Sequence, residues 1–170
     1  MLVSIHSDQR VGVFVDVSNM YYSAKNLYGA KVDFGKVLHA AVSGRKLIRA
    51  FAYVIKADVG TEKEFFDALE KRGFEVRTKD LQVFLGGAKK GDWDVGIAMD
   101  AIRLADKVDV IVLVTGDGDF AALVDYLKNN KGCRVEVVGF ERTTSSMLTS
   151  SADAFSNLED APDKFLIKSK

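Results

Sequence analysis

Acidic side chains stand at three places in this sequence where a strand is expected to end or a helix to begin. Asp16 ends one run, Asp117 and Asp119 follow another that closes at Thr115, and Asp94 stands where a helix is expected to begin. Four carboxylates brought within a few ångströms repel one another unless a divalent cation lies between them, and Mg²⁺ or Mn²⁺ prefers such oxygen ligands. The sequence therefore predicts an Mg²⁺ or Mn²⁺ site at these four acids, with metal-assisted hydrolysis as its chemistry.

Each of the four acids also has a purely structural interpretation. Asp16 and Asp119 are good helix caps, and Asp94 suits the first turn of a helix because of the helix dipole. The Gly116–Asp119 segment has the composition of an ordinary turn. We favour a functional site because the four positions coincide, not because of any one residue.

The elements that must position these acids follow an alternating pattern of short apolar runs and longer amphipathic stretches. Strands are expected at Val11–Val15, Leu47–Val54, Phe74–Thr78, Val110–Thr115 and Arg134–Gly139. Helices are expected at Ser18–Leu27, Phe34–Ser43, Thr61–Arg72, Trp93–Lys107, Phe120–Asn130 and Thr144–Ser151. The pattern predicts an α/β fold with a central, mostly parallel five-stranded sheet flanked by helices, in which ligands bind beyond the carboxyl ends of the strands.

Two of these segments carry finer predictions. On the helix Trp93–Lys107, a stripe of apolar residues is expected to face the core: Val95, Ala98, Met99 and Ile102. The glycine-rich, basic stretch Lys79–Asp92 is expected to be a loop and a candidate flap beside the site.

Several polar residues are candidates for supporting the acids. Asn19, one turn after Asp16, can orient a water or a phosphate, or can be a surface amide. Asp100 lies about 120° from Asp94 around the helix, so it is expected behind the ligands rather than among them. Ser146 follows the fifth strand and either lines the crevice or caps a helix.

Composition sets limits on the function. The 170 residues carry 24 Lys and Arg against 24 Asp and Glu, with one cysteine and two histidines. A lone Cys133 excludes an internal disulfide, and a zinc site of the usual spacing is excluded too. No membrane-length apolar run or signal peptide is evident, so we expect a single-domain, soluble, cytoplasmic protein with no membrane association.

The zero net charge is an average over unlike segments. Residues 1–50 hold seven Lys and Arg against three Asp and Glu, whereas residues 51–120 hold ten against fourteen. Candidate nucleic-acid contacts around the acidic site are Lys25, Lys89, Lys90 and Arg142, with Arg45 and Lys46 as further cations; each is alternatively a solvated surface charge. Tyr21 and Tyr22 either stack against a base or pack in the core.

Four blocks of sequence carry a family resemblance. They are Val13-Phe14-Val15-Asp16-Val17-Ser18-Asn19, Lys90-Gly91-Asp92-Trp93-Asp94-Val95 through Asp100, Thr115-Gly116-Asp117-Gly118-Asp119-Phe120, and Ser146-Met147-Leu148 to Ala152-Asp153-Ala154-Phe155. In order and spacing, over about residues 10–160, the chain resembles the NYN domain, in its LabA-like branch. Thr115 stands where the family usually has Ser, which keeps the hydroxyl, so we count Thr115 among the supporting residues.

The resemblance implies a three-layer, PIN-like fold and an Mg²⁺- or Mn²⁺-dependent ribonuclease. The family's metal-binding acids fall on Asp16, Asp94, Asp117 and Asp119, and RNA, single-stranded or structured, is the expected partner; a homodimer is a candidate assembly. One alternative is a non-catalytic regulatory module that binds RNA or a protein. A second is a metal-dependent phosphatase or a Toprim-type enzyme, although Toprim chemistry would want a Glu where Asp16 stands.

Overall fold

The computed structural model describes residues 6–56, 63–87 and 89–168. Six strands form the central sheet, and every neighbouring pair is parallel. In spatial order they are β4 (Glu75–Lys79), β3 (Lys46–Ile55), β1 (Arg10–Asp16), β7 (Val110–Val114), β8 (Arg134–Gly139) and β9 (Ala154–Asn157). The predicted α/β class and parallel sheet are confirmed, and the five predicted strands correspond to all of these except β9.

The sixth strand corrects the predicted strand count. β9 pairs with β8 from Glu136↔Ala154 to Gly139↔Asn157 at the edge of the sheet. Its residues, Ala-Phe-Ser-Asn, are mostly half-buried. A short edge strand lacks the continuous apolar run that marks a strand covered on both faces, so periodicity alone does not reveal it.

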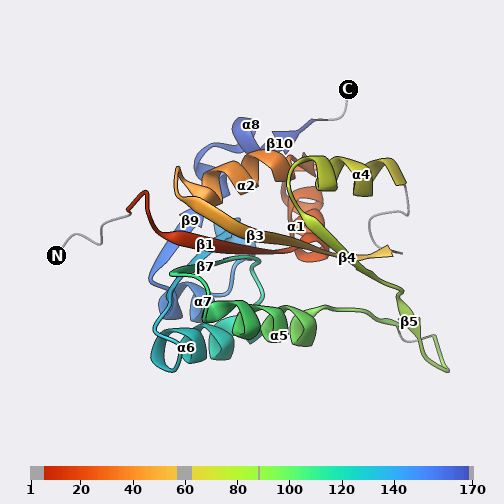
Figure 1. Ribbon diagram of the computed structural model, residues 1–170. Helices are drawn as coiled ribbons and strands as arrows, with labels where there is room; N and C mark the ends of the chain where they lie inside the picture. Colours follow the sequence, from red (N-terminus) through yellow and green to blue (C-terminus); the bar gives the residue numbers. More distant parts are fainter. Residues whose placement is uncertain (1–5, 57–62, 88, 169–170) are drawn as a thin grey trace.

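Helices cover both faces of the sheet and complete three layers (Figure 1). The helices on one face are α1 (Val17–Tyr28), α2 (Phe34–Val42), α4 (Lys63–Lys71) and the short α8 (Pro162–Phe165). Those on the other face are α5 (Asp94–Ala105), α6 (Ala121–Asn129) and α7 (Ser146–Ser151). All six predicted helices have a counterpart; the predicted start of α4 at Thr61 lies outside the described residues.

Alternation along β1 divides the core between the two faces. Val13 and Val15 pack into the cluster that includes α1 and α2, whereas Phe14 packs into the cluster with α5 and α6. Three 3₁₀ turns connect the elements, η1 (Gly118–Phe120), η2 (Glu141–Thr143) and η3 (Leu158–Asp160). None of the helices in the described part of the chain is long and apolar enough to cross a membrane.

The predicted core face of α5 is confirmed for Ala98 and Ile102, which are partly buried against the core, and wrong for Val95 and Met99. Val95 is 75% exposed and Met99 46% exposed. The buried residues of α5 are Ile97, Asp100, Ala101, Leu104 and Ala105. The apolar stripe that packs into the core is the one formed by Ile97, Ala101, Leu104 and Ala105, and Asp100, buried beside it, has partners on the neighbouring strands.

Two pairs of short antiparallel strands complete the fold. β2 (Lys31–Val32) pairs with β10 (Leu166–Ile167) near the end of the chain. β5 (Gln82–Val83) pairs with β6 (Lys89–Lys90), so the stretch predicted as a loop contains a hairpin that projects from the body of the molecule (Figure 1). Gly86 and Gly87 both have positive φ in the turn of this hairpin, which is where glycine is favoured.

Strand order defines the crevice at the carboxyl ends of the strands. Numbered by their order in the chain, the strands of the large sheet lie 3-2-1-4-5-6, so the direction of strand addition reverses between β1 and β7. The loops after these two strands leave in opposite directions and leave room for a ligand between them. Asp16 ends β1, and Asp117 follows β7, so both acids lie at this switch point.

Candidate metal centre

Asp16 is held at the junction of β1 and α1. Its side chain caps α1 by accepting a hydrogen bond from the backbone N–H of Asn19 at 3.4 Å, and its other oxygen accepts one from the hydroxyl of Thr115 at 3.2 Å. Burial raises the pKa of Asp16 to about 6, and the charges of Asp117 and Asp92 add to this rise, which the two hydrogen bonds oppose. The capping interpretation is confirmed, and it leaves the carboxylate at the edge of the acidic cluster.

The loop after β7 orders two further acids by local hydrogen bonds. Thr115 is buried, and its Oγ1 accepts from the backbone N–H of Asp117 at 3.2 Å while donating to Asp16. Asp117 in turn accepts from the N–H of Asp119 at 2.9 Å and caps η1. Thr115 is thus the shared partner that couples the ends of the two central strands.

The glycines of this loop allow a close approach of another segment. We expected Gly116 and Gly118 to permit a tight turn, but neither has a positive φ. A Cβ on Gly116 would instead collide with the carbonyl of Thr143, and one on Gly118 would lie 2.6 Å from Oγ of Ser145. The backbone N–H of Ser145 also donates to the carbonyl of Gly116 at 2.9 Å, so the loop is packed directly against the segment before α7.

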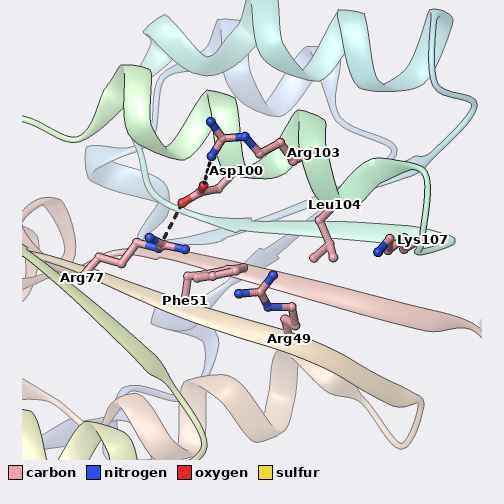
Figure 2. A pocket seen from close by; sticks show the side chains of 7 residues that line it. All are labelled: Arg49, Phe51, Arg77, Asp100, Arg103, Leu104 and Lys107. Atoms are coloured by element: carbon pink, nitrogen blue, oxygen red, sulfur yellow. Dashed lines mark hydrogen bonds and ion pairs between the residues drawn. The ribbon is translucent and has the colours of Figure 1, made fainter.

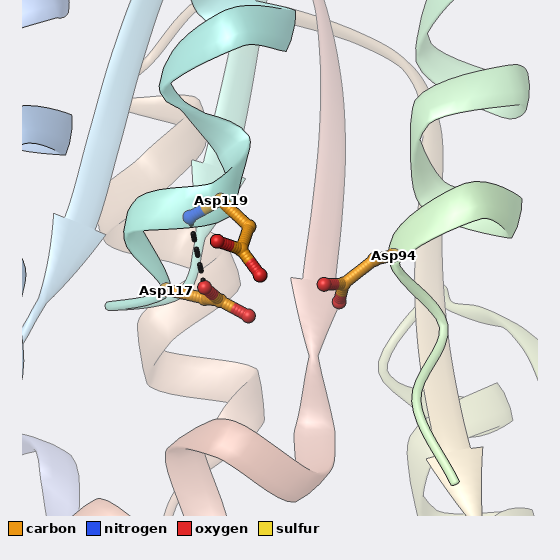
Figure 3. A group of neighbouring side chains, drawn as sticks. All are labelled: Asp94, Asp117 and Asp119. Atoms are coloured by element: carbon orange, nitrogen blue, oxygen red, sulfur yellow. Dashed lines mark hydrogen bonds between the residues drawn. The ribbon is translucent and has the colours of Figure 1, made fainter.

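Asp94 joins the acids of the β7 loop from the first turn of α5. Figure 3 shows the carboxylates of Asp94, Asp117 and Asp119 directed toward one another, and one oxygen from each lies within 4.8 Å of the others. Burial raises the pKa of Asp94 to about 7, with further contributions from the surrounding carboxylates, of which Asp117 is the largest. The charged form of Asp94 is therefore disfavoured when no cation is nearby.

Asp92 is a member of the cluster to which sequence reasoning gave no role. Its Oδ1 accepts from the backbone N–H of Asp94 at 3.0 Å, and its charge raises the pKa of both Asp94 and Asp16. The sequence signal that could have identified Asp92 was the pair of acids on either side of Trp93, in Asp92-Trp93-Asp94. Trp93 between them donates from Nε1 to the carbonyl of Val54 at 3.1 Å, which anchors this segment to β3.

These residues fit a hard divalent cation. Oxygen is the donor type that Mg²⁺ and Mn²⁺ take from proteins, and three carboxylates supply it here. A cation between Asp94, Asp117 and Asp119 would also reverse the repulsion that raises the pKa of Asp94. The set thus qualifies on both donor chemistry and electrostatics, with Asp16 beside it.

The predicted supporting residues do not all lie at the metal centre. Asn19 lies at the site: its side-chain oxygen accepts from the backbone N–H of Gly116 at 2.9 Å and ties α1 to the β7 loop. Asp100 is turned away from the metal centre and accepts a hydrogen bond from the hydroxyl of Tyr53 at 2.8 Å. Ser146 is exposed at the first position of α7, whereas its neighbour Ser145 caps that helix.

The predicted nucleic-acid contacts differ in how freely their charges are available. Lys25 is exposed on α1, with Nζ 5.9 Å from the ring centroid of Tyr21. Arg142 donates from Nε to Glu159 at 2.7 Å, so its charge is partly engaged within the fold. Lys89 and Lys90 form β6, and their side chains lie outside what the structure describes.

Two further cations are wrongly placed by the sequence analysis. Arg45 is buried and forms an ion pair of 2.8 Å with Glu136, so it stabilises the fold and cannot contact RNA. Lys46 begins β3 and therefore lies at the amino edge of the sheet, opposite the acids. Tyr21 is half-buried, and its ring packs edge-on against Tyr22 at 5.3 Å, which leaves both of their interpretations open.

The fold and the site together define a class: a three-layer α/β protein with an acidic, cation-compatible cluster at the switch point of a parallel sheet. The chain belongs to the NYN domain family, because the model of that family matches residues 10–159. NYN domains are PIN-like nuclease domains, so the resemblance found in the sequence is confirmed.

Two relatives support this assignment. The chain is 29% identical over 159 residues to the "low amplitude and bright protein LabA" of Synechococcus elongatus, covering 89% of this chain and 84% of that protein. A crystal structure of VPA0982 from Vibrio parahaemolyticus, titled as a protein of unknown function, superposes with a TM-score of 0.84 at 36% identity. That superposition covers 97% of this chain and 100% of the other.

Proposed function

We propose that this protein is an Mg²⁺- or Mn²⁺-dependent ribonuclease that hydrolyses phosphodiester bonds at the acidic cluster. The observation that carries the proposal is the convergence of Asp94, Asp117 and Asp119 within 4.8 Å at the switch point of a chain of the NYN family. An acidic cluster alone is common on protein surfaces. Its position at the ligand-binding edge of this particular fold makes a nuclease centre the best-supported function.

Each acid has a distinct part in this proposal. Asp94, Asp117 and Asp119 would hold the cation, and Asp16 would add a further carboxylate beside them. A bound divalent cation supplies an activated water at neutral pH and offsets the charge that develops on the phosphate. Thr115 fixes the relative positions of Asp16 and Asp117, since it donates to the first and accepts from the second.

Asn19 holds the two sides of the crevice at a constant distance. Its hydrogen bond to the backbone of Gly116 connects the first turn of α1 with the loop that carries Asp117. In-line attack on a phosphodiester requires the acids from two strands and one helix to keep their positions while substrate binds. The network of Asp16, Asn19 and Thr115 provides this preorganisation.

The test is cleavage of labelled single-stranded RNA with Mn²⁺ or Mg²⁺. We expect activity that EDTA abolishes and that Asp117→Asn lowers by at least about a hundredfold, because Asn carries no charge to hold the cation. Asp125→Asn, which removes an exposed carboxylate on α6 outside the cluster, is the matched control and is expected to stay active. All three proteins must be purified identically, so that a contaminating ribonuclease is detected in Asp117→Asn.

DNA of the same sequence is the second arm, because the acidic cluster itself does not distinguish the two sugars. Preferential cleavage of DNA would show that DNA, and not RNA, is the substrate. RNA that binds but stays intact with both metals would refute the nuclease and leave a non-catalytic RNA-binding module.

A further inference from the structure

A cavity lined by basic side chains lies between α5 and the edge of the sheet formed by β3 and β4 (Figure 2). Its volume is about 210 Å³. The residues that line it are Arg49, Phe51, Arg77, Asp100, Arg103, Leu104 and Lys107. We call it the basic groove; the residues from the two strands face α5.

Positive charge exceeds negative charge in the basic groove. Arg49 forms a two-pronged pair with Glu75, with both N–O distances at 2.7 Å. Arg77 and Arg103 share a single carboxylate, Asp100, at 3.2 Å each. For the ammonium of Lys107, no acid in residues 6–56, 63–87 and 89–168 lies within ion-pair distance. Four cations thus face two acids.

The floor of the basic groove is rigid and closed. The guanidinium carbons of Arg49 and Arg77 lie 4.6 and 5.1 Å from the centroid of the Phe51 ring. Phe51 is only 2% exposed, so its face is already covered and offers no stacking surface to a base. Small-molecule sites usually have roughly 300–1,000 Å³. A smaller cavity lined by guanidinium groups suits a phosphate group, which Arg recognises through paired N–H donors.

The basic groove leads from the metal centre. Register places Asp16 opposite Tyr53, and Tyr53 opposite Arg77, so the inner end of the groove is level with the end of β1. Along the axis of α5, Asp100 lies about 9 Å beyond Asp94, and Leu104 about 15 Å, at about 1.5 Å per residue. Lys107 follows the end of this helix at Ala105. The groove therefore begins within reach of a chain held at the acids and extends away from them.

Another cation stands at the mouth of this path. Lys79, at the carboxyl end of β4, lies with Nζ 4.5 Å from the ring centroid of Trp93 and donates to the carbonyl of Asp92 at 2.8 Å. It is on the same side of β4 as Arg77, two residues earlier, since alternate residues of a strand share a face. Cations thus continue from the carboxyl edge of the sheet into the groove.

We propose that the basic groove binds backbone phosphates of the RNA chain whose scissile phosphate occupies the metal centre. This rests on the proposed function for the identity of the chain, although binding in the groove does not require cleavage. Arg77 and Arg49 contact phosphate from the sheet side, Arg103 contacts it from α5, and Lys107 from the turn that follows α5. The groove gives affinity that is independent of sequence, because phosphate contacts carry no base information.

The test is binding of a labelled single-stranded RNA of about twelve nucleotides, a length within the footprint of single-strand-binding domains, measured by fluorescence anisotropy in EDTA. The variant Arg103→Glu/Lys107→Glu changes two exposed side chains and is expected to bind about tenfold or more weakly at low salt. Each lost phosphate contact lowers the slope of log K against log salt by about 0.7 for a single strand, so this variant should lower it by about 1.4. Lys36→Glu, an exposed cation on the opposite face in α2, is the matched control and should leave binding unchanged.

Single-charge variants keep the test valid if the double variant does not fold. Lys107→Gln removes one exposed charge without reversing it, and is expected to lower the salt slope by about 0.7. Circular dichroism melting of every variant separates loss of binding from loss of fold. An unchanged affinity and slope in a folded Lys107→Gln would overturn the proposal, and so would the same result in a folded double variant.

The remaining outcomes separate this proposal from the nuclease. If adenosine monophosphate displaces the RNA at the concentration at which it binds the protein alone, the phosphate source is a free nucleotide, and the assignment to an RNA chain is overturned. Binding that depends on the groove without any cleavage would refute the nuclease and support the groove. If Asp117→Asn abolishes cleavage but the substitutions at Arg103 and Lys107 leave RNA binding unchanged, the nuclease is supported and the role of the groove is refuted.

Discussion

Removing the charge of Asp16 should stabilise the metal-free protein at neutral pH. Burial raises the pKa of this carboxyl from 3.8 to about 6, so the folded protein holds the proton more tightly than the unfolded chain does. Stability therefore falls as the pH rises from about 4 to above 6. The two pKa values differ by about 2.2. Because a pKa difference of one corresponds to about 1.4 kcal/mol, the free energy of unfolding falls by about 3 kcal/mol over this pH range. Asp16→Asn does not ionise, and its amide oxygen can still cap α1.

Urea unfolding in EDTA between about pH 4 and pH 8 measures this effect. The free energies of unfolding of wild type and Asp16→Asn should be similar near pH 4. Above pH 7 the variant should be more stable by up to about 3 kcal/mol, because only the wild type has to ionise a buried carboxyl. Asp125→Asn controls for the loss of one negative charge elsewhere.

Adding Mn²⁺ should narrow or reverse this difference. Wild type gains stability by mass action, about 2.7 kcal/mol when the free ion is a hundredfold above its dissociation constant, and Asp16→Asn gains less. If Asp16→Asn is less stable than wild type above pH 7 in EDTA, or if their difference does not change with pH, the electrostatic reasoning about the cluster is refuted.

Three further substitutions test the packing beside the site and the buried ion pair. Gly116→Ala should lower the free energy of unfolding by about 1–3 kcal/mol, measured in urea, because its Cβ meets the backbone carbonyl of Thr143. Gly118→Ala should cost less, because its Cβ meets a side chain, Oγ and Cβ of Ser145 at 2.6 and 2.9 Å, and not backbone. Arg45→Ala should cost about 1.5–3 kcal/mol by removing the charged hydrogen bonds to Glu136, which keeps Arg134 as a partner at 2.8 Å. The RNA affinity of the protein, measured by anisotropy at a temperature where it is folded, should stay unchanged; weaker RNA binding would restore Arg45 as a contact.

The large sheet was predictable because its central strands are buried on both faces. Val110–Val114 is a continuous apolar run, as such strands require. The positions of Asp16, Asp94, Asp117 and Asp119 followed from the same pattern, since each comes next to a predicted strand end or helix start. β9 escaped because an edge strand needs only partial burial, and a short polar sequence suffices for it.

The errors share a physical cause, which is a partner distant in sequence. Arg45 looks like any surface cation until Glu136, 91 residues later, is brought against it. Asp100 was expected directly behind the metal ligands, but Tyr53 on β3 and Arg77 on β4 hold it turned away from them. Local periodicity carries no information about such pairs, so a buried charge with a long-range partner is misread as an exposed one.

The bond between Thr115 and Asp16 has a consequence for the order of folding. The two residues are 99 positions apart and belong to adjacent parallel strands. Contacts across such a separation form slowly, because much of the intervening chain must be ordered first. During synthesis β1 must wait for β7 to leave the ribosome, and the acids of the two strands do not meet before then. A nascent chain that stops short of β7 carries Asp16 and Asp94 without the carboxylates that complete their cluster, so the newly made protein acquires its acidic centre only when its fold is nearly finished.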